Sequence, residues 1–131
     1  MKKKKILLID DDEAMRWLIK KMLEKHFEVD AFSHVANAMK HMGLYGRPDV
    51  IITDIHLPII DGKDFLSNLK TNGLYADIPI IVISSRQDED TKKQCLEAGA
   101  AEYLIKPFDP EKLLEIIINL SDYSSKSKIN I

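Results

Sequence analysis

The sequence predicts an α/β fold: a five-stranded parallel sheet of order 2-1-3-4-5, doubly wound, with five helices on its two faces. Strand-like and helix-like patterns alternate along the 131 residues, which is typical of repeated β-α units. The strand patterns are apolar runs, as expected for parallel strands that helices cover on both faces. Right-handed crossovers in a chain of this length favour the doubly wound arrangement.

Runs rich in apolar residues mark the strands. We expect strands at residues 5–9, 28–32, 50–53, 78–83 and 101–105. The second run is more polar than the others, which suits an edge of the sheet. Pro79 lies at the start of the fourth run, where its missing N–H does least harm to the ladder.

The first two helices follow from apolar spacing and from capping residues. One helical face is formed by Met15, Leu18, Ile19, Met22 and Leu23. Asp12 is a candidate cap for this helix, and the alternative for the same carboxylate is a metal ligand. Ser33 is a candidate cap for the second helix, which Gly43 and Gly46 bring to an end.

Glycine, proline and aspartate bound the next two helices. Residues 57–62, Leu-Pro-Ile-Ile-Asp-Gly, predict a loop. The third helix carries Phe65, Leu66 and Leu69. It closes near Asn72-Gly73. The fourth helix spans about residues 88–98, with Gly99 as its C-cap.

The last helix begins at Asp109-Pro110, a cap followed by proline at the first helical position. We expect it to run to about Leu120. The sequence therefore predicts one domain over residues 1–120, followed by a polar, flexible tail over residues 121–131.

Composition narrows the classes of function. With 19 Lys and Arg against 21 Asp and Glu, the net charge of −2 argues against direct nucleic-acid binding. We interpret the run Lys2–Lys5 as a solvated lead-in to the first strand instead of an RNA or membrane patch. Cys95 is alone, so no internal disulfide can form. No stretch approaches the roughly 20 apolar residues of a membrane span, and the lysines near the N-terminus are not followed by the long apolar region that a signal peptide has. We therefore expect a cytoplasmic protein.

Three strand-like runs end in charged residues that a core could not bury. The first ends at Asp10-Asp11-Asp12, the third at Asp54 and the last at Lys106-Pro107. Because the carboxyl ends of parallel strands lie side by side in an open α/β sheet, we expect these charges to converge. Oxygen ligands without His or Cys select a hard ion, Mg²⁺ or Mn²⁺. A carboxylate at such a place can also form an aspartyl phosphate.

Two further groups suit a phosphoryl site. Ser84 ends the fourth strand with a hydroxyl that can donate to a phosphoryl oxygen, and Lys106 supplies an ammonium for another. The backbone N–H groups after Ser84 and the carbonyl of His56 are placed to help if their loops fold over the site.

In this order and spacing the residues resemble the receiver domains of two-component response regulators, including the single-domain chemotaxis and sporulation types. The resemblance covers residues 4 to about 120. Its motifs are Ile9-Asp10-Asp11, Asp54 with Leu57-Pro58 and Asp61-Gly62, Ser84, Gly99-Ala100 and Tyr103-Leu104-Ile105-Lys106-Pro107-Phe108. It implies the flavodoxin-like form of the fold predicted above.

The resemblance implies a metal site and a phosphoacceptor. Asp54 looks like the phosphoacceptor. Asp11 and Asp54 resemble the side-chain ligands of Mg²⁺, with the backbone carbonyl of His56 as the third protein ligand. Asp10 matches the second acid, which reaches the metal mainly through water.

The resemblance also implies a switch. Lys106 resembles the phosphate-binding lysine, Ser84 the switch hydroxyl in place of the commoner threonine, and Tyr103 the aromatic residue that turns inward when that hydroxyl moves. In the family the Lys-Pro bond is usually cis. His56 and Arg86 occupy positions whose side chains tune the lifetime of the phosphoryl group.

The implied function is a phosphoacceptor switch and not a turnover enzyme. A histidine kinase or histidine phosphotransfer protein loads Asp54, the changed surface signals to a partner or output domain, and self-dephosphorylation resets the protein. Some members form homodimers through helix four, strand five and helix five. Trp17, with Met15, Leu18 and Pro107, is a candidate docking patch for the phosphotransfer helix, and packing under a neighbouring loop is the alternative for Trp17.

Two rival interpretations stay open. One is a haloacid-dehalogenase-like phosphatase that uses Asp10 and Asp12, with Ser84 and Lys106 on the phosphate, although a further acidic pair is expected in that class. The other is a pseudo-receiver that binds a partner without phosphorylation. The sequence does not identify the kinase or the output, and its polar tail suits an excised domain or a short free-standing one.

Overall fold

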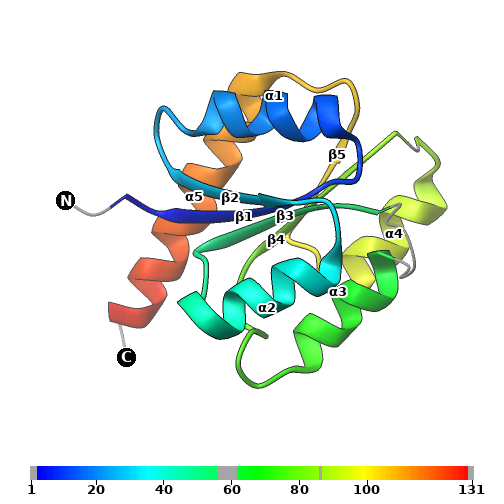
Figure 1. Ribbon diagram of the computed structural model, residues 1–131. Coiled ribbons are helices and arrows are strands. Elements are labelled where there is room, and N and C mark those ends of the chain that lie inside the picture. The colour runs from blue at the N-terminus through cyan, green and yellow to red at the C-terminus, as the bar shows by residue number, and fades with distance from the viewer. Residues whose placement is uncertain (1–2, 56–61, 86, 130–131) are drawn as a thin grey trace.

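The computed structural model describes residues 3–55, 62–85 and 87–129, in which strands alternate with helices (Figure 1). The strands are β1 (Lys5–Ile9), β2 (Glu28–Phe32), β3 (Val50–Asp54), β4 (Ile80–Ser84) and β5 (Glu102–Ile105). The helices are α1 (Glu13–Leu23), α2 (Val35–Tyr45), α3 (Gly62–Thr71), α4 (Glu89–Glu97) and α5 (Pro110–Ile129). The strands are parallel and lie in the order β2-β1-β3-β4-β5, which confirms the predicted fold class.

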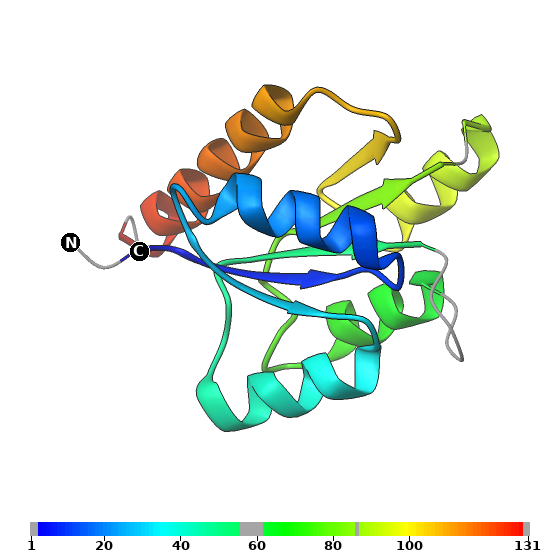
Figure 2. The same ribbon diagram turned by 45° about the horizontal axis from the view of Figure 1, so that its top comes forward.

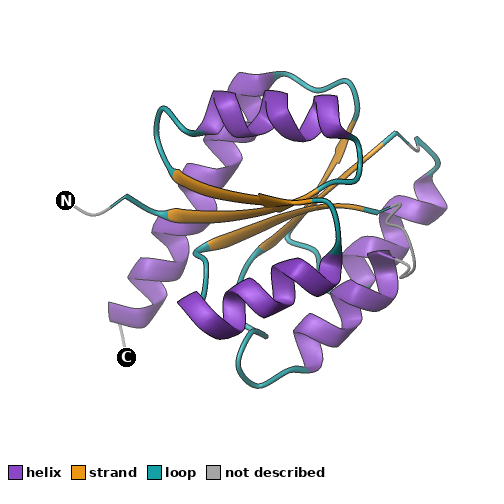
Figure 3. Cartoon of the chain, viewed as in Figure 1, coloured by secondary structure: helices purple, strands orange, loops and turns teal. Residues whose placement is uncertain are grey.

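Helices cover both faces of the sheet (Figure 3). Side chains of α1 and α5 pack on one face, in a core that includes Leu8, Ile19, Leu23, Ile52 and Leu113. Side chains of α2, α3 and α4 pack on the other face, in a core that includes Ile9, Met42, Leu66, Val82 and Cys95. Because successive residues of a strand point to opposite faces, a strand between two cores is apolar at nearly every position.

The strand register places the ends of β1 and β3 next to each other. Ile9 of β1 pairs with Thr53 of β3, so the residues that follow, Asp10 and Asp54, lie side by side. Ser84 pairs with Ile105, which brings Lys106 next to the end of β4. All strand arrows point to the same edge of the sheet (Figure 2). We call this edge, with Asp10, Asp54, Ser84 and Lys106, the carboxyl edge.

Aspartate side chains begin three of the helices. The Asp12 carboxylate accepts a hydrogen bond from the Met15 N–H at 3.1 Å, which confirms its predicted role as the cap of α1. The Asp88 and Asp109 carboxylates accept from backbone N–H groups of the first turns of α4 and α5, at 3.0 and 2.9 Å. These bonds satisfy donors that a helix start leaves unpaired.

Two helix caps differ from the prediction. His34, not Ser33, is the N-cap of α2, because His34 keeps an extended backbone (φ −134°, ψ 143°) and the helix begins after it. The Ser33 hydroxyl instead contacts His34 Nδ1 at 2.8 Å. Ala98, not Gly99, is the C-cap of α4. Gly99 follows with φ 115°, the left-handed conformation that commonly comes directly after a C-cap.

The start of β4 and the end of α5 also differ from the prediction. β4 begins at Ile80, after Pro79. α5 continues beyond the expected end at Leu120 to Ile129, since residues 121–129 contain no glycine or proline that would stop a helix. The flexibility of residues 121–131 stays a prediction.

The apolar face of α1 is narrower than predicted. Ile19 and Leu23 are buried, and Met15 and Met22 are partly buried against them. Leu18 was expected on this face, but 56% of its surface is exposed. The residues of α1 that pack in this core are Met15, Ile19, Met22 and Leu23, and Leu18 lies beside them on the helix surface, outside the core.

Candidate functional site

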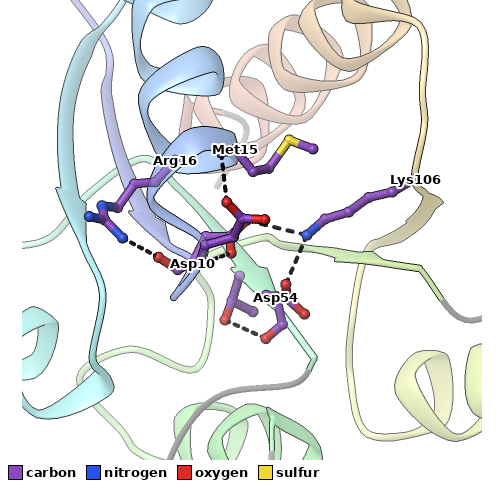
Figure 4. Close-up of polar contacts among 7 residues, drawn as sticks. Asp10, Met15, Arg16, Asp54 and Lys106 are labelled. Atoms are coloured by element: carbon purple, nitrogen blue, oxygen red, sulfur yellow. Dashed lines mark hydrogen bonds and ion pairs between the residues drawn. The ribbon is translucent and has the colours of Figure 1, made fainter.

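Charged side chains from three strand ends meet at the carboxyl edge (Figure 4). Asp10 directly follows β1, Asp54 ends β3 and Lys106 directly follows β5. Each comes at the end of an apolar strand that the two cores hold in place, so the sheet positions these residues rigidly. The predicted convergence of charge is therefore present in the structure.

Asp10, Asp11 and Asp54 form one cluster of carboxylates. One oxygen from each lies within 4.8 Å of the others. Asp10 and Asp54 are buried, whereas Asp11 is exposed. Acids this close repel one another unless a cation compensates them. Because every donor atom is an oxygen, the cluster fits Mg²⁺ or Mn²⁺ and not a softer metal.

The positive charge of Lys106 compensates the negative charges of the two buried acids, Asp10 and Asp54. Its Nζ donates to Asp54 Oδ2 at 2.9 Å and to Asp10 Oδ2 at 3.3 Å. Burial acts to lower the pKa of Lys106, but the hydrogen bond to Asp54 and the charges of both acids together outweigh burial, so the pKa is raised above the ordinary 10.5. Lys106 is therefore a fixed positive charge at neutral pH.

Asp10 is held by contacts to three parts of the chain. Its backbone N–H donates to the Phe32 carbonyl at 3.0 Å, and its Oδ1 accepts the Asp12 N–H at 3.0 Å. Burial raises the pKa of the Asp10 carboxyl, and the Asp54 charge adds to this, against the lowering by the Asp12 N–H and Lys106. The ionised form of Asp10 is thus less favourable here than in water, and a bound cation would favour it again.

Of the predicted switch residues, Ser84 lies at the carboxyl edge and Tyr103 lies in the core. Ser84 is fully buried at the end of β4, and its carbonyl accepts the Lys106 N–H at 2.7 Å. Tyr103 is buried in the core under α2, α3 and α4. The Lys106–Pro107 bond is cis, as the resemblance implied. His56 and Arg86, for which roles were also predicted, lie outside the described residues.

Asp12 lies beside the cluster without joining it. Its carboxylate caps α1, so the alternative role of metal ligand is not the one that the structure shows. The phosphatase alternative required Asp12 as an acid that works with Asp10. A carboxylate committed to a helix start is poorly suited to that task.

Arg16 is a residue of this site that the sequence analysis missed. Its Nη1 donates to the backbone carbonyl of Asp10 at 2.8 Å (Figure 4). Its target is a backbone atom, so no motif of side chains indicates the contact. The spacing of Arg16 one turn into the helix after the acidic loop was the available signal.

α1 presents an exposed apolar surface near the cluster. Trp17 is 60% exposed and Leu18 is 56% exposed. Met15 is partly buried and Pro107 is exposed. The exposure of Trp17 argues against the alternative, in which it packs under a neighbouring loop.

Comparisons with known proteins agree on one family. A family model described as the response regulator receiver domain matches residues 6–118. This chain belongs to that family. The receiver domain is 29% identical over 123 residues to the chemotaxis protein CheY1 of Helicobacter pylori, covering 90% of this chain and 99% of CheY1. It is 30% identical over 118 residues to the transcriptional regulator NtrC of Proteus hauseri, covering 89% of this chain and 24% of NtrC.

Solved structures support the same assignment. A putative response regulator from Chloroflexus aurantiacus superposes with a TM-score of 0.86 at 29% identity, covering 92% of this chain and 99% of that one. The chain spans half or less of the length of several curated relatives that it matches.

The family establishes the general function. This is a receiver domain of two-component signalling, a switch and not a classical enzyme. Receiver domains generally bind Mg²⁺ at an acidic pocket, and they interact with histidine kinases and output domains. Within the described ranges, no helix is both long and apolar enough to cross a membrane.

Proposed function

We propose that Asp54 of this receiver accepts a phosphoryl group from a phosphohistidine of a histidine kinase or histidine phosphotransfer protein. The observation that carries the proposal is the setting of Asp54. Lys106 Nζ lies 2.9 Å from Asp54 Oδ2, and the cluster of acids lies beside the same carboxylate. Asp54 therefore has an ammonium and a cation site around it, the two kinds of charge that stabilise phosphoryl transfer.

The transfer uses Asp54 as the nucleophile. A carboxylate oxygen forms a bond to phosphorus, the phosphorus–nitrogen bond breaks, and the donor imidazole leaves with the electron pair. Asp11, Asp54 and the His56 carbonyl would hold Mg²⁺, with Asp10 in contact through water. When bound, Mg²⁺ neutralises charge on the phosphoryl oxygens. The part assigned to His56 rests on the family resemblance alone.

Lys106 and Ser84 respond to the phosphoryl group. Because Lys106 already contacts Asp54, its ammonium can bind a phosphoryl oxygen after a small movement. Ser84, which is fully buried at the neighbouring strand end, donates its hydroxyl to another oxygen. Tyr103 then follows Ser84, and the face formed by α4, β5 and α5 changes shape. This is a shift of population between two states.

Two surfaces serve partners in this proposal. The exposed Trp17 and Leu18 of α1, with Met15 and Pro107, receive the helix that carries the donor histidine. On the other surface, Leu96, Ile105 and Ile118 are exposed by 41%, 36% and 43%. They offer apolar contacts for an output domain or for a homodimer through α4, β5 and α5.

Water resets the switch by hydrolysis of the aspartyl phosphate. The acyl phosphate bond breaks and inorganic phosphate leaves, with Asp54 restored. Because the domain acts on its own phosphoryl group, this is self-dephosphorylation and not turnover of an external substrate.

Mass spectrometry after treatment with a small phosphodonor and Mg²⁺ tests the proposal. We expect an adduct of one phosphoryl group on the wild type that is lost in Asp54→Asn and retained in Asp64→Asn, which changes an exposed acid of α3. An adduct that survives in Asp54→Asn would contradict the proposal. So would turnover of a phosphate ester that survives Asp54→Asn and is lost in Asp10→Asn, which would favour the phosphatase. No adduct at Asp54 would favour the pseudo-receiver.

A further inference from the structure

Arg16 joins the start of α1 to the acidic loop. We propose that Arg16 is a positioning residue for the metal site: it fixes the backbone of residues 10–12 and so holds the Asp10 and Asp11 carboxylates in place for a divalent cation. The inference rests on the proposed function, because it assumes a cation among Asp10, Asp11 and Asp54.

Arg16 is bonded to both ends of the loop. Its backbone N–H donates to the Asp12 carbonyl at 2.9 Å, as the first turn of the helix requires. Its side chain turns back, and Nη1 donates to the Asp10 carbonyl at 2.8 Å. The second bond is charge-assisted and partly buried, so it is stronger than an ordinary backbone hydrogen bond. One residue therefore sets the distance between the end of β1 and the start of α1.

The acid that most needs this support is Asp11. Asp10 is anchored by its N–H and by both carboxylate oxygens. The Asp11 side chain is exposed, and it makes no hydrogen bond or ion pair among the described residues. The place of its carboxylate is thus set by the backbone that carries it. The peptide group between Asp10 and Asp11 includes the carbonyl that Arg16 holds, so loss of Arg16 frees this group to rotate.

The charge of Arg16 and its positioning role predict opposite effects of Arg16 on the affinity for Mg²⁺. A guanidinium next to a cation site repels the cation, so its charge alone makes Mg²⁺ binding weaker. Removal of Arg16 should then tighten binding. If Arg16 positions the ligands, its removal should loosen binding instead, as happens when residues that orient metal ligands are changed.

A matched control lies one turn further along the same helix. Lys20 and Arg16 line one shallow groove of about 690 Å³ beside Trp17 and Ala31. The Lys20 ammonium pairs with Glu24 at 3.0 Å and not with the acidic loop. Lys20→Met therefore removes a cation from the same groove and leaves the contact with Asp10 intact.

Calorimetric titration of the unphosphorylated protein with Mg²⁺ tests the inference. In Arg16→Met we expect Mg²⁺ to bind about tenfold more weakly, at the low end of such effects. Arg16→Lys should recover part of the affinity, because an ammonium donates to a carbonyl but lacks the planar fork. Lys20→Met should bind as the wild type does. The rate of phosphorylation by a small phosphodonor should return towards the wild-type rate when Mg²⁺ is saturating.

Hydrogen exchange of the Asp12 amide in the metal-free protein gives a second measurement. This amide donates to Asp10 Oδ1, so we expect faster exchange in Arg16→Met and unchanged exchange in Lys20→Met. Equal or tighter Mg²⁺ binding in Arg16→Met, or an equal loss in Lys20→Met, would overturn the inference. Failure of the wild type to bind Mg²⁺ would instead overturn the proposed function, and unchanged Asp12 exchange would then overturn the role of Arg16 as well.

Discussion

Two partly buried lysines at opposite ends of the sheet have opposite pKa shifts. Burial acts to lower the pKa of both Lys70 and Lys106. Lys70 Nζ donates to the carbonyls of Ala76 and Ile78 at 3.2 and 2.9 Å. These acceptors are neutral, so burial outweighs the charge of Asp77, which acts to raise the pKa, and the pKa of Lys70 is lowered. Lys106 faces two carboxylates instead, and its pKa is raised.

The difference shows that the partners of a lysine, and not its burial, decide its role in this fold. Lys70 connects α3 with the loop before β4, and its aliphatic stem lies against Gly99 after α4. It supports structure at the amino end of the sheet. Lys106 is a fixed charge between two acids at the carboxyl edge. An anion that enters the site can bind its ammonium in place of these acids. Four substitutions or additions test this comparison.

The largest effect is expected for Lys106→Met in the absence of metal. We expect the free energy of unfolding to fall by about 3 kcal/mol, because the substitution leaves the buried Asp10 and Asp54 without their cation. Urea denaturation measures the change. Lys112→Met, which removes an exposed lysine of α5, should change stability by less than about 0.5 kcal/mol. Equal stabilities for wild type and Lys106→Met would show that the ammonium does not compensate the acids.

Mg²⁺ should stabilise the fold only by binding to the acids at the carboxyl edge. At a hundred times its Kd, a ligand that binds only the folded state adds about 2.7 kcal/mol to the free energy of unfolding. We expect this gain in the wild type and in Lys70→Met. Asp54→Asn and Asp11→Asn should lose most of it, and a chelator should reverse it. An equal gain in Asp54→Asn would mean that the ion binds elsewhere.

Gly99→Ala tests the region of Lys70. Gly99 has φ 115°, and an added Cβ would lie 2.5 Å from Lys70 Cγ. We expect a loss of about 2 kcal/mol, measured by urea denaturation, because the left-handed backbone disfavours a side chain and the lysine must move. Gly43→Ala is the matched control, since its added Cβ meets nothing within 4 Å and its helical position favours alanine. Combining Gly99→Ala with Lys70→Ala should recover part of the loss; strict additivity would show that Lys70 is not the obstacle.

The smallest effect is expected for Lys70→Met. Loss of the two hydrogen bonds to carbonyls lowers stability by about 1 kcal/mol at neutral pH, and release of a charge that burial disfavours offsets part of this. Because the folded pKa of Lys70 lies below its ordinary 10.5, the unfolded chain holds more protons in the interval between the two values. The stability of the wild type should therefore rise relative to Lys70→Met as the pH increases through that interval. Urea denaturation at a series of alkaline pH values measures the free energies of unfolding of the two proteins. A stability of the wild type that falls relative to Lys70→Met as the pH increases would contradict the lowered pKa of Lys70.

The sequence predicted most elements because their signals are local. Apolar runs and the three-four spacing of helices depend on neighbours in the chain, and so do caps such as Asp12 and Asp109. The errors fall where a local pattern allowed more than one outcome. Leu18 fits the apolar stripe of α1 but lies outside the core and is exposed. Ser33 is a residue type that often caps helices, but α2 begins one residue later, with His34 as its N-cap.

The acids and the lysine of the candidate site were also predictable, because motif order and strand ends were enough to indicate them. Arg16 was not, since it acts on a backbone carbonyl and a lone arginine on a helix is usually solvated. The roles assigned to His56 and Arg86 stay predictions.

By itself the sequence determined the order of strands and helices, the family and the set of charged residues at the strand ends. Those properties are encoded in short segments, where the period of the apolar residues and the spacing of the motif residues decide them. Only the tertiary structure decided which charges meet. Lys106 and Asp10 are 96 residues apart in the chain and touch at 3.3 Å, whereas Lys70, with the same side chain, donates to the carbonyls of Ala76 and Ile78. The physical reason is that a pKa and a metal site depend on distances between groups, and the packing of the sheet sets those distances.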